Sequence, residues 1–342
     1  MDIKRYKPYI IAVGFLAVFQ YGTAQQLTIL DSTGTTSLRG ISTLNANTFW
    51  ASGNQGTVVH SLNGGKTLNW QTVKGHEKRD FRSVVALSAG TALIMAVDNP
   101  ALILKTTDTG RTWKTVYEKN KPGMFLDAMA FDDPEHGYCV GDPIDGRFWI
   151  IETLDSGNTW AEYPLLERPE AKPGEALFAS SGSNIQFVNQ QDYGWGFVTG
   201  GLTSRLILMG NNILIPPKAT QLGLVQGMQS KGANSWAANG KNWMIVGGNY
   251  AAPLEDSGNA CISTSAGSSW ITVPKTLGYK SSVANWKNGY LCCGTSGVAV
   301  CNQQGNAWKR VSKTPFHACA TTADGKVAYL VGPKGSVAKL VQ

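Results

Sequence analysis

A bulky apolar residue followed three positions later by glycine recurs along the chain, within short apolar runs that are typical of buried strands. The seven copies are Trp50/Gly53, Met95/Asp98, Tyr138/Gly141, Phe197/Gly200, Met244/Gly247, Leu291/Gly294 and Tyr329/Gly332, with Asp replacing Gly in the second. Successive copies begin between 38 residues (291 to 329) and 59 residues (138 to 197) apart. This period is the size of one blade, so the pattern predicts an all-β, seven-bladed β-propeller of four-stranded antiparallel blades.

A second pattern runs in phase with the first and predicts a tight turn before the outer strand of a blade. Residues 106–113 and 153–160 both read S/T-x-D-x-G-x-T-W, and residues 61–67 are a third copy with Asn63 in the Asp position. Residues 263–270 and 301–308 keep the Gly and the Trp but lose the Asp. In such a turn the polar side chains bond backbone amides, Gly takes the left-handed conformation and Trp packs onto the blade. We therefore assign structural roles to Asn63, Asp108, Trp113, Asp155, Trp160, Trp270 and Trp308.

The last repeat is one strand short, because the chain ends within the third strand of that unit. The apolar run Leu27–Leu30 is expected to supply the missing outer strand and close the ring, which removes an exposed strand edge. Residues 25–342 then form a single domain. Its blades are expected to begin near Thr36, Asp80, Gly123, Glu175, Gln221, Tyr279 and Phe316.

Residues 1–24 have the pattern of a signal peptide. Lys4, Arg5 and Lys7 precede the apolar run Tyr9–Phe19, and a small residue, Ala24, follows in a position suited to cleavage. The run is short for a membrane span, so an uncleaved anchor is the weaker alternative. The sequence thus predicts a periplasmic or secreted protein that has no membrane anchor after cleavage.

Composition narrows the choice of partners. The net charge is +7, but no cluster of Lys or Arg concentrates it, so we do not expect nucleic acid binding. The six cysteines and four histidines match no metal or redox spacing, and we expect neither a metal nor a cofactor. A two-residue turn at Ser296-Gly297 would place Cys292 opposite Cys301, where an oxidising compartment permits a disulfide; two free buried thiols are the alternative.

The chain resembles the BNR/Asp-box propellers and, within them, the photosystem II stability/assembly factor-like family. The resemblance covers nearly the whole chain after residue 24 and rests on segments in phase with the repeat. These segments are Ser37–Gly40, Trp50–Gly53, Gly123–Asp127, Gly141–Arg147 and Val331–Gly335. The resemblance implies an assembly or stability factor for another protein, although nothing in the sequence marks a photosynthetic partner.

The face opposite the Asp-box turns is the better candidate for binding, because it gathers the loops before the inner strands and those between the second and third strands. The candidate residues on it are Arg39, Arg82, Asp127, Asp142, Asp145, Arg147, Arg205 and His317. Four arginines around one mouth would bind an anion. The alternative is that each pairs with a local carboxylate, for instance Arg82 with Asp80 or Arg147 with Asp145.

Two functions follow from this placement. The first is a non-catalytic, exported, monomeric propeller that binds a protein partner of the cell envelope. The alternative is a sialidase-like glycoside hydrolase or a glycan-binding propeller, in which Tyr279 would be the nucleophile and Glu175 and Asp127 the carboxylates. Because Tyr279 has no obvious carboxylate partner in the sequence, a catalytic role is the weaker prediction.

Overall fold

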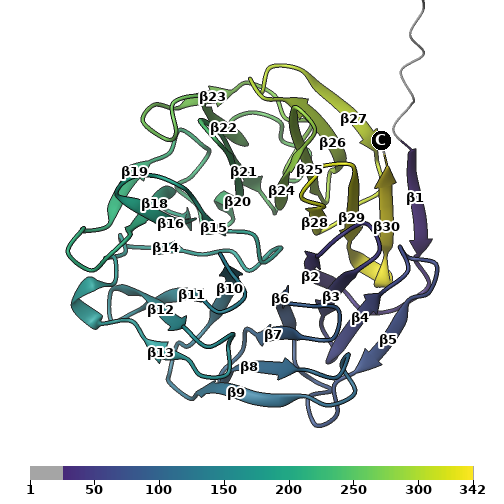
Figure 1. Cartoon of the computed structure of the whole chain (residues 1–342). Coiled ribbons are helices and arrows are strands. Elements are labelled where there is room, and N and C mark those ends of the chain that lie inside the picture. The colour runs from purple at the N-terminus through teal and green to yellow at the C-terminus, as the bar shows by residue number, and fades with distance from the viewer. Residues whose placement is uncertain (1–25, 342) are drawn as a thin grey trace, which may run out of the picture.

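The computed structural model describes residues 26–341, which form a ring of seven four-stranded antiparallel blades (Figure 1). The expected signal peptide therefore lies outside the described residues. The first three blades are β2 (Leu38–Thr43), β3 (Phe49–Gly53), β4 (Thr57–Ser61) and β5 (Asn69–Thr72); β6 (Phe81–Ala86), β7 (Ala92–Ala96), β8 (Ala101–Thr106) and β9 (Lys114–Lys119); and β10 (Leu126–Phe131), β11 (Gly137–Ile144), β12 (Arg147–Thr153) and β13 (Ala161–Glu162).

The next three blades repeat this order. They are β15 (Ile185–Phe187), β16 (Tyr193–Val198), β18 (Arg205–Gly210) and β19 (Lys218–Gln221); β20 (Lys231–Asn239), β21 (Asn242–Asn249), β22 (Ala260–Ser263) and β23 (Ile271–Val273); and β24 (Ser282–Trp286), β25 (Gly289–Gly294), β26 (Gly297–Asn302) and β27 (Trp308–Ser312). Two short 3₁₀ turns, η1 (Leu165–Glu167) and η2 (Pro333–Gly335), complete the helical content of residues 26–341.

The seventh blade joins the two ends of the chain. It contains β28 (Ala318–Thr321), β29 (Val327–Val331) and β30 (Val337–Val341), and its outer strand is β1 (Gln26–Asp31). Strand β1 pairs antiparallel with β30, with Leu27 opposite Leu340. The prediction that the N-terminal run closes the ring is confirmed.

Packing between blades explains why the repeat is so apolar. The described residues form seven apolar clusters, and each lies between two neighbouring blades, as Trp50 of the first blade does against Ile94 of the second. Strands β3, β7 and β8 are buried along their whole length because both of their faces contact a neighbouring blade. Apolar runs therefore replace the alternating pattern of a half-exposed sheet.

The predicted turns form with the expected hydrogen bonds. The Asp108 carboxylate accepts from the Thr112 amide at 2.9 Å and from the Thr112 hydroxyl at 2.6 Å, and Asp155 and Asn63 occupy the same role in their blades. The indole rings pack inward: Trp113 lies edge-on to Trp50, Trp160 edge-on to Phe131, and Trp270 beside Trp243. The Trp308 indole donates to the Gly305 carbonyl at 2.8 Å.

Two expected blade starts are wrong. The inner strands of the fourth and fifth blades begin at Ile185 and Lys231, not near Glu175 and Gln221. Glu175 lies instead in β14 (Glu175–Ala176), which pairs with β17 (Gly200–Gly201) beside the fifth blade. Gln221 ends the outer strand of the fourth blade. The connection between β13 and β15, which contains η1 and the extra strand β14, lengthens this part of the chain and explains the long spacing before the fourth repeat.

The proposed disulfide register is also wrong. The turn falls at Thr295-Ser296, so Cys292 lies opposite Ala299 and Cys301 opposite Tyr290. Both cysteines are free and buried, as are the other four. Burial raises the pKa of Cys292 well above its ordinary value, which keeps this thiol protonated and unreactive.

Candidate functional site at the channel mouth

A β-bulge near the start of the inner strand recurs in four blades. The pairing register shifts at Arg39 in β2, Arg82 in β6, Asp127 in β10 and Asn234 in β20. A bulge places two residues opposite one on the neighbouring strand and thereby redirects a side chain. The bulges therefore place one polar side chain from each of these four blades at the same end of the central channel.

A pocket of about 440 Å³ opens at this end of the channel, on the face opposite the Asp-box turns. Arg39, Arg82, Asp142 and His317 line it, so the structure brings together four of the residues that the sequence singled out. Asp127 is fully buried beside them. The other lining residues are Phe125, Leu177, Phe178, Ala179, Ser180, Tyr250, Tyr279, Ser281 and Thr295.

Arg39 is the least paired charge in this pocket. Within residues 26–341 its guanidinium has one hydrogen-bond acceptor, the Ser180 carbonyl, at a long 3.5 Å. Burial, together with the neighbouring Arg82, lowers the pKa of Arg39, although an arginine remains charged at any physiological pH. Arg82 is neutralised locally, because its Nε lies 2.8 Å from the Asp80 carboxylate. The pocket therefore offers one unsatisfied guanidinium to an incoming anion.

Both carboxyl groups beside Arg39 have a raised pKa. Burial, and then the neighbouring Asp142, raise the pKa of Asp127 well above its ordinary value, and Arg82 offsets this only in part. Both carboxyl oxygens of Asp127 are buried without a hydrogen bond of ordinary geometry, and the nearby Ala179 and Asp142 amides offset the shift only in part. Burial raises the pKa of Asp142 to about 6, although a hydrogen bond of 2.8 Å from the Leu177 amide acts to lower it. The raised pKa of Asp127 favours its neutral form, whereas Asp142 is still mostly ionised at pH 7 and loses its charge as the pH falls through about 6.

His317 and Tyr279 are both neutral at pH 7. Burial, followed by repulsion from Arg39 and Arg82, lowers the pKa of His317 to about 3. Burial raises the pKa of Tyr279 to about 12, and its hydroxyl donates to the Asn234 side-chain oxygen at 2.8 Å. The Ser180 hydroxyl donates to the same oxygen at 2.8 Å. The Tyr279 hydroxyl is thus hydrogen-bonded to an amide side chain, whereas a sialidase-like tyrosine nucleophile needs a carboxylate as its partner.

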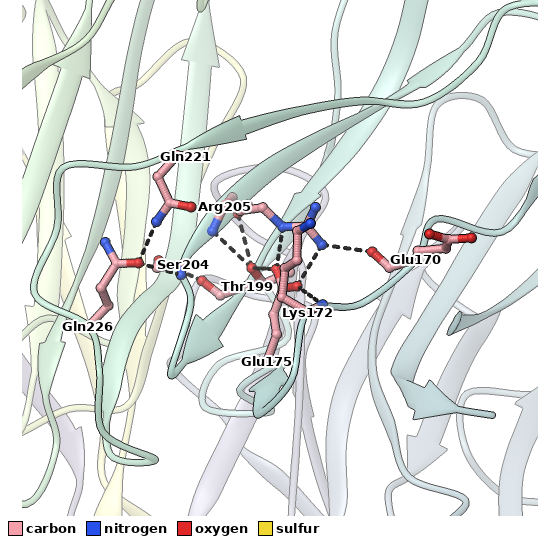
Figure 2. Close-up of polar contacts among 8 residues, drawn as sticks. All are labelled: Glu170, Lys172, Glu175, Thr199, Ser204, Arg205, Gln221 and Gln226. Carbon is pink, nitrogen blue, oxygen red and sulfur yellow. Dashed lines mark hydrogen bonds and ion pairs between the residues drawn. The ribbon is translucent and has the colours of Figure 1, made fainter. Parts of the chain in front are cut away.

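The expected mouth of four arginines is not formed, because Arg147 and Arg205 line a different pocket, of about 300 Å³. Arg205 is buried and pairs with both oxygens of Glu175, at 2.8 Å and 2.5 Å (Figure 2). Arg147 pairs with Glu170 at 2.6 Å and donates to the Arg168 carbonyl at 2.6 Å. The local-pairing alternative holds for both residues, although Arg147 takes Glu170 as its partner.

Asp145 also lies outside the channel mouth, at the turn between β11 and β12, where Lys121 pairs with it at 3.0 Å. Neither Phe178, which lines the pocket, nor Asn234, whose side-chain oxygen accepts from Ser180 and Tyr279, was predicted from the sequence. Asn234 occupies the same bulge position as Arg39, but the misplaced start of the fifth blade hid this equivalence. Phe178 follows the extra strand β14, for which the repeat contains no signal.

Two further classes of site are not found in the described part of the chain. No group of three or more His, Cys, Asp or Glu side chains is arranged to hold a metal ion there. No helix within residues 26–341 is long and apolar enough to cross a bilayer.

The sequence matches no protein-family model and no curated protein. Solved structures do resemble it. A structure described as YCF48 bound to D1 peptide has a TM-score of 0.64 at 14% identity and covers 94% of this chain and 96% of its own. YCF48 from Cyanidioschyzon merolae has a TM-score of 0.62 at 14% identity, covering 92% and 98%. The WD40 β-propeller domain of Doa1 has a TM-score of 0.62 at 12% identity, covering 94% and 98%. At these identities the likeness shows the fold alone.

Proposed function

We propose that this chain is an exported, non-catalytic propeller that binds a protein partner at the channel mouth, where Arg39 receives an acidic group of that partner. The observation that carries the proposal is the Arg39 guanidinium, which is partly buried and has a single long hydrogen bond, to the Ser180 carbonyl. A buried cation without a partner costs free energy, and an incoming carboxylate would remove that cost.

The shape and lining of the pocket favour a peptide over a small anion. The pocket has a volume of about 440 Å³, far more than one carboxylate needs. Tyr250 is 49% exposed at its edge and contacts Phe178 edge-on, with ring centroids 5.7 Å apart. Aromatic residues beside a guanidinium are typical of the central anchors of protein interfaces. One structure of the same fold, YCF48, is described as bound to a D1 peptide, so a peptide-binding propeller has precedent.

The proposal also covers the protein family to which this chain belongs and its location in the cell. We place the chain with the BNR/Asp-box propellers, near the photosystem II stability/assembly factor-like family, on the in-phase segments of the repeat and the hydrogen-bonded turns. The basic and apolar segments of residues 1–24 support cleavage after Ala24 and a monomeric, periplasmic or secreted protein. N-terminal sequencing of protein recovered from the cell envelope tests this part, and a first residue other than Gln25 contradicts it.

A peptide-binding assay tests the proposed function. Fluorescence anisotropy would screen a library of labelled peptides that carry acidic side chains or a free C-terminal carboxylate. For a binding peptide, amidation of the recognised carboxylate and the substitution Arg39→Ala should each weaken binding by about tenfold or more. Arg39→Lys should restore part of the affinity, because it keeps the charge but loses the fork of donors.

The control variant is Arg111→Ala, which removes an exposed arginine from an Asp-box turn on the opposite face. This variant should bind the peptide like the parent. Equal affinity in Arg39→Ala and the parent would overturn the proposal. So would turnover of a sialoside that is lost in Arg39→Ala, since that result would favour the hydrolase.

A further inference from the structure

Trp70 does not have the role of the other turn tryptophans. In the first blade Leu68 holds the position where Trp113 and Trp160 stand in their blades, and Leu68 packs against the apolar cluster between the first and last blades. Trp70 follows two residues later in β5 and is 36% exposed. Every other tryptophan in residues 26–341 is buried or partly buried. Neither the turn nor the apolar core therefore accounts for the exposed position of this indole.

The indole lies at a pocket of about 370 Å³, separate from the channel mouth. One wall is the segment that runs from β1 to β2, and the other is the outer strand β5 with the turn at Gln55. Gly34 and Gly335 form a tight backbone contact beside the ring. A Cβ on Gly335 would lie 3.3 Å from the Trp70 Cη2 atom and 3.2 Å from the Gly34 Cα. The two glycines thus allow the indole to lie against the backbone.

The polar groups at this pocket are hydroxyls, amides and one carboxylate. The side chains of Thr35, Gln55 and Thr57 have no hydrogen-bond partner within residues 26–341. Gln55 also has a φ of 58°, in a turn position that normally takes Asn, Asp or Gly. A strained residue with a free side chain at a pocket edge points to function.

The charge of the lining residues limits the class of ligand that this pocket can bind. The lining contains no Lys or Arg, and Asp31 is its one charged residue. Partial burial acts to raise the pKa of the Asp31 carboxyl, but hydrogen bonds from Thr33, Ser32 and Trp70 outweigh it and lower that pKa. The carboxylate is therefore ionised at neutral pH and repels anions. The lining thus excludes anions. Because its other polar groups are uncharged amides and hydroxyls, it best suits a neutral ligand with many hydroxyls and an apolar face for the indole.

We propose that this pocket binds a neutral saccharide, with one sugar ring stacked on Trp70 and its hydroxyls bonded to Asp31 and Gln55. Sugars combine an apolar C–H face with hydroxyls that both donate and accept, which matches an indole beside amide and carboxylate groups. The site is independent of the Arg39 pocket. Both lie on the same face of the ring, because Gln55 is in the loop between the second and third strands of its blade.

Tryptophan fluorescence reads this site directly, because Trp70 is the exposed indole of the described chain. The probes are neutral trisaccharides of glucose, mannose, galactose and N-acetylglucosamine, titrated into the full-length protein to millimolar concentration. A bound sugar should protect Trp70 from quenching by acrylamide. Saturation-transfer NMR on the same samples should place the contact on the C–H face of one ring.

The variants are Trp70→Ala, Trp70→Phe and Gln55→Ala. We expect Trp70→Ala to weaken binding by about tenfold or more, Trp70→Phe to restore part of it, and Gln55→Ala to weaken it less than Trp70→Ala does. The matched control is Ile271→Ala, which removes an exposed apolar side chain from β23, another outer strand.

Arg39→Ala should leave saccharide binding unchanged, which separates this site from the proposed function. The proposal is overturned if none of the four trisaccharides binds, or if one binds Trp70→Ala as tightly as it binds the parent. It is also overturned if Trp70→Ala weakens the acidic peptide and not the sugar, because the pocket would then be part of the protein interface.

Discussion

Glu175→Gln tests whether the buried ion pair between Glu175 and Arg205 holds one wall of the channel mouth. The Glu175 carboxylate is fully buried and accepts four hydrogen bonds (Figure 2). Two come from Arg205, one from the Thr199 hydroxyl at 2.5 Å and one from the Lys172 amide at 2.8 Å. The amide of Gln would place donors against these donors and leave the Arg205 charge uncompensated.

The expected cost is large for a conservative change. Removing one partner of a buried pair typically costs about 3–5 kcal/mol, and at about 2 °C per kcal/mol this lowers the melting temperature by about 6–10 °C. Asp145→Asn is the matched control, since it breaks an ion pair with Lys121 in which both side chains are more than a third exposed. An exposed pair of that kind contributes about 1 kcal/mol or less.

The effect of Glu175→Gln on peptide binding can be separated from its effect on stability. Leu177, Phe178 and Ser180 line the channel mouth and follow Glu175 directly in the chain. Glu175→Gln should therefore weaken acidic-peptide binding well below the melting temperature, whereas Asp145→Asn should not. The double variant Glu175→Leu with Arg205→Met should recover most of the stability, because it removes both charges together.

Urea unfolding followed by tryptophan fluorescence measures the free energies, and anisotropy measures the peptide affinity. A loss below about 1 kcal/mol for Glu175→Gln, at an unchanged dependence on urea, would refute the reasoning. A double variant no more stable than Glu175→Gln would show that the carboxylate acts through contacts other than Arg205.

Two further predictions concern the channel itself. The pKa of Asp142 is about 6 in the fold against an ordinary 3.8, so its contribution to stability is complete below about pH 4 and is lost as pH rises through 6. Asp142→Asn should therefore be more stable, relative to the parent, at pH 7 than at pH 4. Acidic-peptide affinity in the parent should rise as pH falls from 7 to about 5, and Asp142→Asn should remove that rise; an unchanged profile in both assays contradicts the assignment. Ser83→Ala should lower the free energy of unfolding by about 1–3 kcal/mol, because the Ser83 hydroxyl accepts from the buried Met129 amide of the next blade at 3.1 Å, and a variant as stable as the parent would argue against this link.

The repeat in the sequence determined the architecture because each copy is a local unit. The spacing of the apolar residue and its Gly marks the second strand of each blade, and this strand is buried between neighbours wherever the blade stands in the ring. The turn residues Asp108 and Asp155 were predictable for the same reason, since their hydrogen bonds reach four residues along the chain. Ring closure followed from counting strands.

Tertiary structure decided which charges meet. Arg39 and Arg205 look alike in the sequence, but Arg205 finds Glu175 in an extra strand that the repeat does not contain, while Arg39 finds a lone carbonyl. The bulge at Asn234 and the exposed face of Trp70 likewise depend on backbone register and on neighbours distant in the chain. A residue's type limits the chemistry available to it, but whether its charge stays unpaired depends on which side chains the fold brings within hydrogen-bond distance.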